Sequence, residues 1–152
     1  MKICDVLQKE TILADLKAQN KKGILEELVA PVSEIAGVNQ EDLVKVLMER
    51  EQLGSTGIGG GIGIPHGKMK DIDSLILGFG LSRKGVDFES LDGQPTHIFF
   101  LLITPENSTG LHLKLLARIS RILKDDPFKS RLLNATNGDE ILDIIREEDE
   151  DF

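Results

Sequence analysis

The sequence has no tryptophan or tyrosine, and its 152 residues include only one cysteine, Cys4. A single cysteine excludes an internal disulfide and a thiolate metal cluster. No apolar run reaches the roughly 20 residues that a membrane-spanning helix needs, so we expect no membrane span. An acid at Asp5 interrupts the first apolar residues and breaks the pattern of a secretory signal. The simplest expectation is a cytoplasmic protein.

Basic residues are also few, since 18 lysines and arginines stand against 26 acids and give a net charge of −8. The sequence has no basic stripe, which argues against nucleic acid as a partner. The acidity suits a protein partner with a basic docking face. Part of it lies in the tail 147–152, which we expect to be solvated and frayed. The length fits one domain over residues 1–152.

Hydrophobic spacing predicts an alternation of strands and helices. A strand is expected at 11–16, a helix at 22–36 that ends at Gly37, and a helix from the N-cap Asn39 to about residue 51. Strands are expected at 74–81 and 96–103, the second stopped by Pro105, with a connecting loop over 83–91. Helices should follow from Ser108 or Thr109 to about 125, at 128–134 and at 139–147. This order predicts an α/β fold in which helices cover a sheet.

The most unusual stretch runs from Gly57 to Lys68, where glycine is concentrated and the run ends in Pro65 and His66. Glycine permits positive φ and close approach of the backbone, but it costs conformational entropy. The isoleucines of the stretch are expected to anchor it in a core. Because Pro65 stiffens the chain before it, His66 should sit on a rigid segment beside free backbone N–H groups. Such a histidine is suited to meeting an anion.

Two further residues are candidates for the same site. Arg50 continues the apolar face of the helix before the glycine stretch. In one interpretation its side chain extends to solvent and its charge stabilises the helix C-terminus. In the other its planar guanidinium binds a phosphate through two N–H groups. His112 lies on the inward edge of the long helix, as a satisfied core histidine or as a group that contacts His66 or its phosphate. His97, at the start of the strand at 96–103, is expected to be structural.

Ser55 and Thr56 precede the glycine stretch, and their hydroxyls either stabilise a turn or donate to a bound anion. Spacing excludes several familiar sites. The stretch does not match a Walker loop or a dinucleotide fingerprint, and the three histidines lack metal-ligand spacing. A nucleophile elbow is missing as well. We therefore predict no cofactor and no metal. The residues that remain fit a histidine that carries a phosphoryl group.

Two segments resemble the enzyme IIA domains of the mannitol/fructose class in the phosphoenolpyruvate-dependent sugar phosphotransferase system. The similar segments are Glu49-Arg50-Glu51-x-Leu53-Gly54-Ser55-Thr56-Gly57-Ile58-Gly59 and Gly61-Ile62-x-Ile64-Pro65-His66-Gly67-Lys68, with a later helix start at Leu111-His112-Leu113. The resemblance implies a three-layer α/β/α sandwich with a mixed sheet. It also implies that His66 accepts phosphate, through Nε2, from the phosphocarrier HPr or a paralogue of it. His112 and Arg50 match the family's second histidine and its arginine. Ser55, Thr56 and Gly67 are the candidate phosphate-binding residues.

Many family members have asparagine at the position of Gly60 and alanine at that of Gly63, and both departures remove side-chain contacts near the site. The chain looks similar to the nitrogen-regulatory branch, in which phosphorylation controls other proteins. One alternative is a separate fructose- or mannitol-type subunit that passes phosphate to a IIB component. Another is a non-catalytic interaction module, as in the cytoplasmic domain of some anion transporters. Such a module is expected to lose the histidine, whereas His66 is present here.

Overall fold

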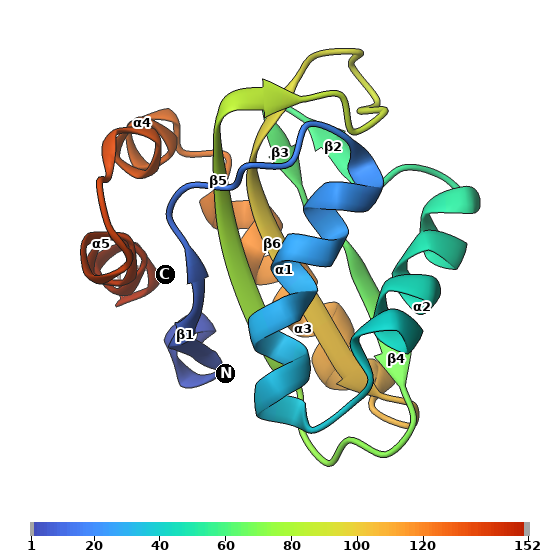
Figure 1. Ribbon diagram of the computed structural model, residues 1–152. Coiled ribbons are helices and arrows are strands. Elements are labelled where there is room, and N and C mark those ends of the chain that lie inside the picture. The colour runs from blue at the N-terminus through green and yellow to red at the C-terminus, as the bar shows by residue number, and fades with distance from the viewer. Residues whose placement is uncertain (1, 151–152) are drawn as a thin grey trace.

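The computed structural model describes residues 2–150, except for the side chains of Thr109 and Leu111. Its centre is a six-stranded mixed sheet with the order β1-β5-β6-β3-β2, in which β4 also pairs with β6 (Figure 1). The strands are β1 (Leu7–Leu13), β2 (Gly57–Gly59), β3 (Ile62–Gly63), β4 (His66–Met69), β5 (Ile76–Val86) and β6 (Thr96–Pro105). Because β6 is antiparallel to β5 but parallel to β3 and β4, the sheet is mixed.

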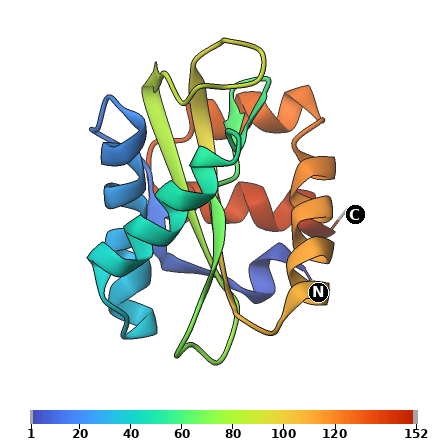
Figure 2. The same cartoon turned by 90° about the vertical axis from the view of Figure 1, so that its right-hand side faces the viewer.

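Helices cover both faces of this sheet, as Figure 2 shows with the sheet nearly edge-on. One face carries α1 (Lys21–Ala36) and α2 (Gln40–Gln52). The other carries α3 (Thr109–Ile122), α4 (Asp126–Asn134) and α5 (Gly138–Glu150), together with the short 3-10 helix η1 (Ile3–Asp5). The predicted three-layer α/β/α sandwich is therefore confirmed.

Strand β6 shows how the sequence builds two cores from one strand. Side chains of a strand alternate between the faces of the sheet. Ile98, Phe100 and Leu102 pack into the core beneath α3, α4 and α5. Phe99, Leu101 and Ile103 pack into the core beneath α1 and α2. A strand buried on both faces reads as a continuous apolar run, which is why its position was predictable.

Glycines on β5 let α1 approach the sheet closely. A Cβ built at Gly80 would lie 2.7 Å from Leu16 Cδ1 and 2.8 Å from Leu28 Cδ2, both closer than real Cβ contacts. A Cβ at Gly78 would lie 3.2 Å from Val32 Cγ2. The helix therefore packs against backbone at these positions, and a larger residue at position 80 would push it outward.

The predicted caps are confirmed, and several predicted boundaries are corrected. Gly37 ends α1 with a φ of 69°, and the Asn39 side chain accepts a hydrogen bond from the N–H of Asp42. The first strand lies at Leu7–Leu13 rather than 11–16, and β5 continues through half of the expected loop to Val86. The glycine stretch contains three short strands, which pattern alone did not predict.

The acidic tail is helical as far as the described residues reach. Helix α5 continues to Glu150, beyond the end predicted at 147, while residues 151–152 lie outside the described part of the chain, and the fraying of the tail stays a prediction. Asp149 is buried, and its carboxylate is stabilised there because it accepts hydrogen bonds from the backbone N–H of Cys4 at 3.0 Å and from Arg118 Nε at 2.7 Å. This contact joins α5 to α3 and to η1. Among residues 2–150, no helix is both long and apolar enough to cross a membrane.

Candidate functional site

The glycine stretch forms a small hairpin that delivers His66 to the sheet. Strands β2 and β3 pair as an antiparallel ribbon whose tip, Gly59 to Gly61, has positive φ at all three glycines. The chain then joins β6, with Ile62 opposite Ile98 and His66 opposite Leu102. Ile62 and Ile64 are buried as predicted, whereas Ile58 is 44% exposed and does not anchor the stretch. The ring of His66 thus starts from a strand that is hydrogen-bonded into the sheet.

One nitrogen of the His66 ring is held by the backbone. Nδ1 lies 2.8 Å from the carbonyl oxygen of Ile64. A carbonyl oxygen can only accept a hydrogen bond, so Nδ1 carries a proton. In the neutral ring the lone pair is then on Nε2, which is the nitrogen able to act as a nucleophile.

The surroundings of His66 favour its neutral form. Burial is the main cause that lowers the pKa of His66 below its ordinary value of 6.5, and the Arg50 cation lowers it further. The hydrogen bond to Ile64 and the charge of Glu51 act in the opposite direction without cancelling the decrease. At neutral pH the ring is therefore unprotonated on Nε2 and ready to react.

His112 lies directly against His66, as its inward position on the helix predicted. The two ring centroids are 5.1 Å apart with an interplanar angle of 66°, an edge-on contact. His112 is 8% exposed, and its Nδ1 lies 3.4 Å from the hydroxyl of Thr104 on β6. Burial lowers the pKa of His112 as well, with added contributions from His66 and Lys68. Two neutral imidazoles can share this site without repelling each other.

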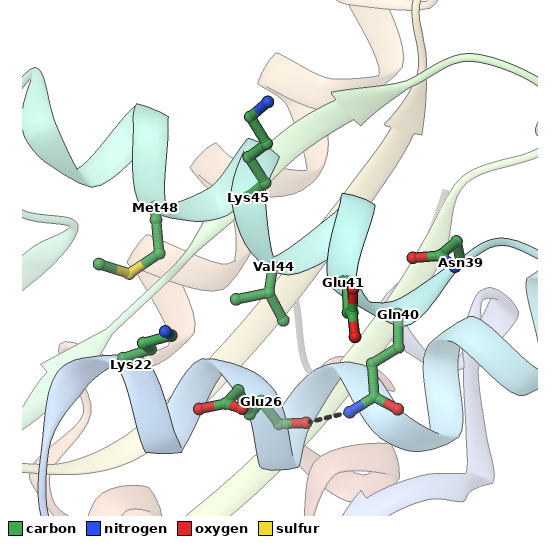
Figure 3. A pocket seen from close by; sticks show the side chains of 8 residues that line it. All are labelled: Lys22, Glu26, Asn39, Gln40, Glu41, Val44, Lys45 and Met48. Carbon is green, nitrogen blue, oxygen red and sulfur yellow. Dashed lines mark hydrogen bonds between the residues drawn. The ribbon is translucent and has the colours of Figure 1, made fainter.

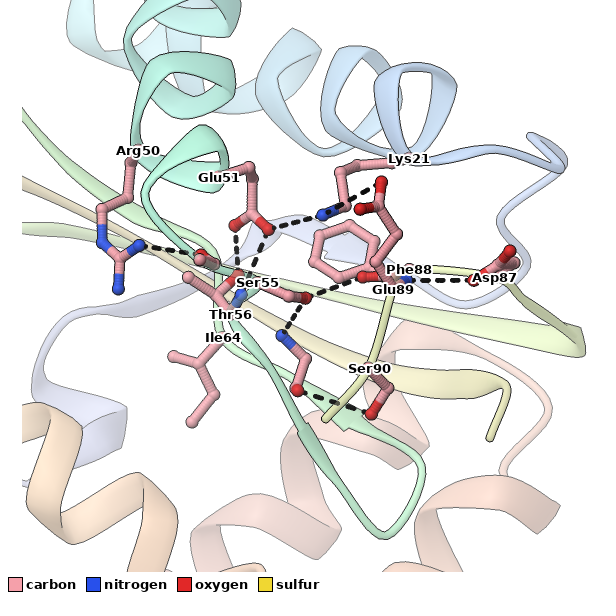
Figure 4. A network of polar contacts seen from close by, with 12 residues as sticks. Lys21, Arg50, Glu51, Ser55, Thr56, Ile64, Asp87, Phe88, Glu89 and Ser90 are labelled. Carbon is pink, nitrogen blue, oxygen red and sulfur yellow. Dashed lines mark hydrogen bonds and ion pairs between the residues drawn. The ribbon is translucent and has the colours of Figure 1, made fainter. Parts of the chain in front are cut away.

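Arg50 lies on the last turn of α2. Its geometry has features of both interpretations, contact with the helix C-terminus and binding of an anion. Its Nη1 donates to the carbonyl oxygen of Gly54 at 2.9 Å, which satisfies a backbone group just beyond the helix C-terminus (Figure 4). The same cation is near enough to lower the pKa of His66. The guanidinium has more donors than this one contact uses, so it can bind an anion while it holds Gly54.

The hydroxyls of Ser55 and Thr56 are directed into the protein. Ser55 Oγ donates to the carbonyl oxygen of Phe88 at 2.8 Å and accepts from the N–H of Gly57. The hydroxyl of Thr56 donates to the Glu51 carboxylate, and Thr56 is 4% exposed. Each hydroxyl has one proton to donate, so this geometry favours the turn-stabilising role over phosphate binding. Their phosphate-binding role stays a prediction.

Gly67 lies where β4 passes under α2. A Cβ at this position would be 3.0 Å from Val46 Cγ1 and 3.5 Å from Leu47 Cδ2. The absence of a side chain therefore allows α2, which carries Arg50, to lie against the strand that begins with His66. This packing role was not part of the prediction for Gly67, whose contact with phosphate also stays a prediction.

The sequence reasoning missed Glu51, whose side chain is 3% exposed. The spacing of four residues from Leu43 through Leu47 reaches position 51, so the buried stripe of α2 includes this glutamate. That spacing was the signal that could have found it. Lys68, two residues after His66, was also not singled out, and its charge acts on His112.

A groove of about 900 Å³ lies between α1 and α2, on the outer surface of that layer (Figure 3). The residues that line it are Lys22, Glu26, Asn39, Gln40, Glu41, Val44, Lys45 and Met48. Its mixture of two lysines, two glutamates and two amide side chains gives no preference for an anion. It includes neither histidine of the site nor Arg50, so the candidate chemistry lies elsewhere. Within residues 2–150, no three His, Cys, Asp or Glu side chains are grouped so as to hold a metal ion.

Residues 5–148 match the family model described as "Phosphoenolpyruvate-dependent sugar phosphotransferase system, EIIA 2". A nitrogen regulatory protein of Bradyrhizobium diazoefficiens is 39% identical over 145 residues, which are 95% of each chain. The fructose-specific EIIABC component of Bacillus subtilis is 38% identical over 150 residues, which are 98% of this chain but 24% of that longer protein.

Solved structures agree with these sequence matches. The crystal structure of the nitrogen regulatory protein IIA-Ntr from Neisseria meningitidis has a TM-score of 0.89 at 30% identity, over 94% of this chain and 98% of that one. The mannitol IIA domain of Escherichia coli, solved in complex with phosphorylated IIB, has a TM-score of 0.79 at 22% identity, over 93% of this chain and 99% of that one, and shows the same fold. The chain belongs to the EIIA 2 family of the phosphoenolpyruvate-dependent sugar phosphotransferase system.

Proposed function

We propose that this protein is a phosphohistidine carrier that accepts a phosphoryl group on Nε2 of His66 from HPr or its paralogue in the cytoplasm. The observation that carries the proposal is the 2.8 Å contact between Nδ1 and the Ile64 carbonyl oxygen, which leaves Nε2 with the lone pair. The lowered pKa of His66 supports it, because a neutral ring is the nucleophile that phosphoryl transfer requires.

The transfer exchanges one P–N bond for another. The lone pair of His66 Nε2 forms a bond to phosphorus, while the bond from phosphorus to the donor's imidazole breaks and its electron pair stays on the donor ring. The His66 ring gains positive charge in this step. Since Nδ1–H points at the Ile64 carbonyl oxygen, the negative end of that dipole stabilises the charge without any movement of the ring.

Arg50 and His112 are proposed to hold the phosphoryl oxygens. Arg50 supplies charge and unused N–H donors at the end of α2. His112, edge-on to His66 at 5.1 Å, supplies an imidazole N–H or steadies the His66 ring. We assign Ser55 to the support of the loop, because its hydroxyl already bridges Phe88 and Gly57.

For the role downstream, we propose nitrogen-regulatory signalling rather than sugar uptake. The solved IIA-Ntr structure is 30% identical with a TM-score of 0.89, whereas the mannitol IIA structure is 22% identical with a TM-score of 0.79. The second candidate remains a fructose- or mannitol-type subunit that donates to a IIB component, as in the IIA–IIB complex of the mannitol system.

The test is phosphorylation in a reconstituted system of phosphoenolpyruvate, enzyme I and HPr. Wild type should acquire an acid-labile label and His66→Ala should not, with His97→Ala as a control that keeps the label. Adding IIB components separates the two downstream roles, since rapid discharge to a sugar-specific IIB supports the second. Equal labelling of wild type and His66→Ala would exclude His66 as the acceptor. A complete lack of labelling of wild type would favour the non-catalytic interaction module.

A further inference from the structure

Glu51 is a buried carboxylate surrounded by donors at the edge of the site. Its oxygens accept from the backbone N–H of Thr56 at 3.1 Å, from the hydroxyl of Thr56, and from Lys21 Nζ at 3.0 Å (Figure 4). A carboxylate removed from water is costly unless such partners replace the lost hydration. Here the partners are supplied by two segments: the first turn of α1 and the residue that precedes β2.

Lys21 is placed where its charge opposes the dipole of its own helix. It is the first residue of α1, and a cation at a helix N-terminus opposes the helix dipole. Its side chain is only 11% exposed, with Nζ 4.8 Å from the centroid of the Phe88 ring and 3.7 Å from Glu89. Since local helix preference disfavours Lys21, its position is explained by its tertiary contacts, and the 3.0 Å contact with Glu51 is the shorter of its two ion pairs.

A continuous series of hydrogen bonds leads from this ion pair to the histidine. Glu51 holds the N–H and hydroxyl of Thr56, and the Thr56 carbonyl oxygen accepts from the N–H of Ile64 at 3.0 Å. The Ile64 carbonyl oxygen in turn accepts Nδ1–H of His66 at 2.8 Å. The intervening hairpin is rich in glycine and has positive φ at its tip, so its conformation depends on the buried Ile62 and Ile64 and on hydrogen bonds to neighbouring segments.

We propose that Glu51 and Lys21 are positioning residues for His66, which act by fixing Thr56 and thereby the carbonyl group that selects the reactive nitrogen of the imidazole. This inference rests on the proposed function of His66. Stability alone is a weak reason for the ion pair, because apolar residues of similar volume often replace a buried pair without loss. An ion pair that begins the series of contacts ending at Nδ1 has a reason to be charged and directional.

The experiment compares Glu51→Gln with Glu27→Gln in the full chain. Glu27 is a matched control, since its carboxylate also accepts from the backbone N–H groups of Lys17 and Ala18, but it is not part of the series that reaches His66. Two quantities are measured: the rate of phosphoryl transfer from phosphorylated HPr, and the ¹⁵N chemical shifts of the His66 ring, which report its tautomer. For Glu51→Gln we expect a mixture of tautomers and a transfer rate lower by about tenfold to a hundredfold. Glu27→Gln should match wild type in both.

A second variant separates positioning from stability. In Lys21→Met/Glu51→Met the pair is replaced by apolar side chains, so the melting temperature should stay near that of wild type. The tautomer should still be mixed and the transfer slow. The inference is overturned if either variant keeps the Nδ1–H tautomer and the wild-type rate, or if neither folds, because the pair would then be purely structural. If wild type itself accepts no phosphate, the proposed function fails, while the ¹⁵N comparison still tests the positioning.

Discussion

Replacing Gly67 by alanine tests whether this glycine serves packing or phosphate binding. The added Cβ would lie 3.0 Å from Val46 Cγ1, a separation tighter than nine in ten real Cβ contacts. Strand β4 cannot yield easily, since it pairs with β6 from His66 to Met69. The Val46 side chain must therefore give by a few tenths of an ångström, and because valine is stiff at χ1 we expect α2 and Arg50 to shift with it.

The expected cost follows from two opposing effects. Overpacking of this kind costs about 1–3 kcal/mol. Alanine is favoured over glycine in a strand by about 0.5–1 kcal/mol. We expect Gly67→Ala to lower the free energy of unfolding by about 1 kcal/mol. Truncation of the opposing side chain in Val46→Ala removes the colliding methyl group, so the double variant should lose less than the sum of the two single variants.

Urea denaturation of wild type, both single variants and the double variant gives the coupling energy directly. A coupling of about 1 kcal/mol that favours the double variant is expected. If Gly67→Ala also slows phosphoryl transfer by displacing Arg50, the double variant should recover the wild-type rate. Costs that add to within about 0.5 kcal/mol would refute the packing explanation. A slow transfer that Val46→Ala does not restore would instead support a direct contact between Gly67 and the phosphoryl group.

Three further predictions concern the charge and backbone of the site. Because the folded pKa of His66 and of His112 lies below 6.5, the unfolded chain binds more protons there, so stability is greatest above pH 6.5 and falls as the pH drops through the lower folded values. The urea midpoint should decrease from pH 7.5 to 5.5, and a His66→Gln variant that keeps the full decrease would contradict this. Arg50→Gln should raise the pKa of His66 in an NMR titration, because the Arg50 cation lowers that pKa. An unchanged pKa would show that Arg50 does not act on His66. Gly60 has a φ of 67°, which asparagine tolerates, so Gly60→Asn should stay within about 1 kcal/mol of wild type while Gly60→Val loses more.

The sequence predicted structure best where a feature depends only on residues close together in the chain. Gly37 and Asn39 mark the end of one helix and the start of the next, because a left-handed C-cap and an Asx N-cap are settled within a few residues. The apolar run of β6 and the helical stripe that carries His112 were readable for the same reason. The fold class follows from their order along the chain.

Boundaries that depend on partners were not readable. Strand β5 continues to Val86 because residue 86 pairs with Thr96, although Arg83 and Lys84 look like loop residues. Helix α5 remains helical through its acidic end because Asp149 meets Arg118 and Cys4, which lie far away in sequence. In both cases the stabilising partner comes from a distant part of the chain.

For the site, the sequence by itself placed a histidine on a stiff segment after a flexible one, with an arginine and a second histidine on inward faces. Only the tertiary structure places the ring centroids of His66 and His112 5.1 Å apart and makes the Ile64 carbonyl oxygen the partner of His66 Nδ1. It also directs the hydroxyls of Ser55 and Thr56 into the protein. Residue types limit which chemistry is available. Which atom is free to react depends on hydrogen bonds between segments that meet only when the sheet and α2 pack together.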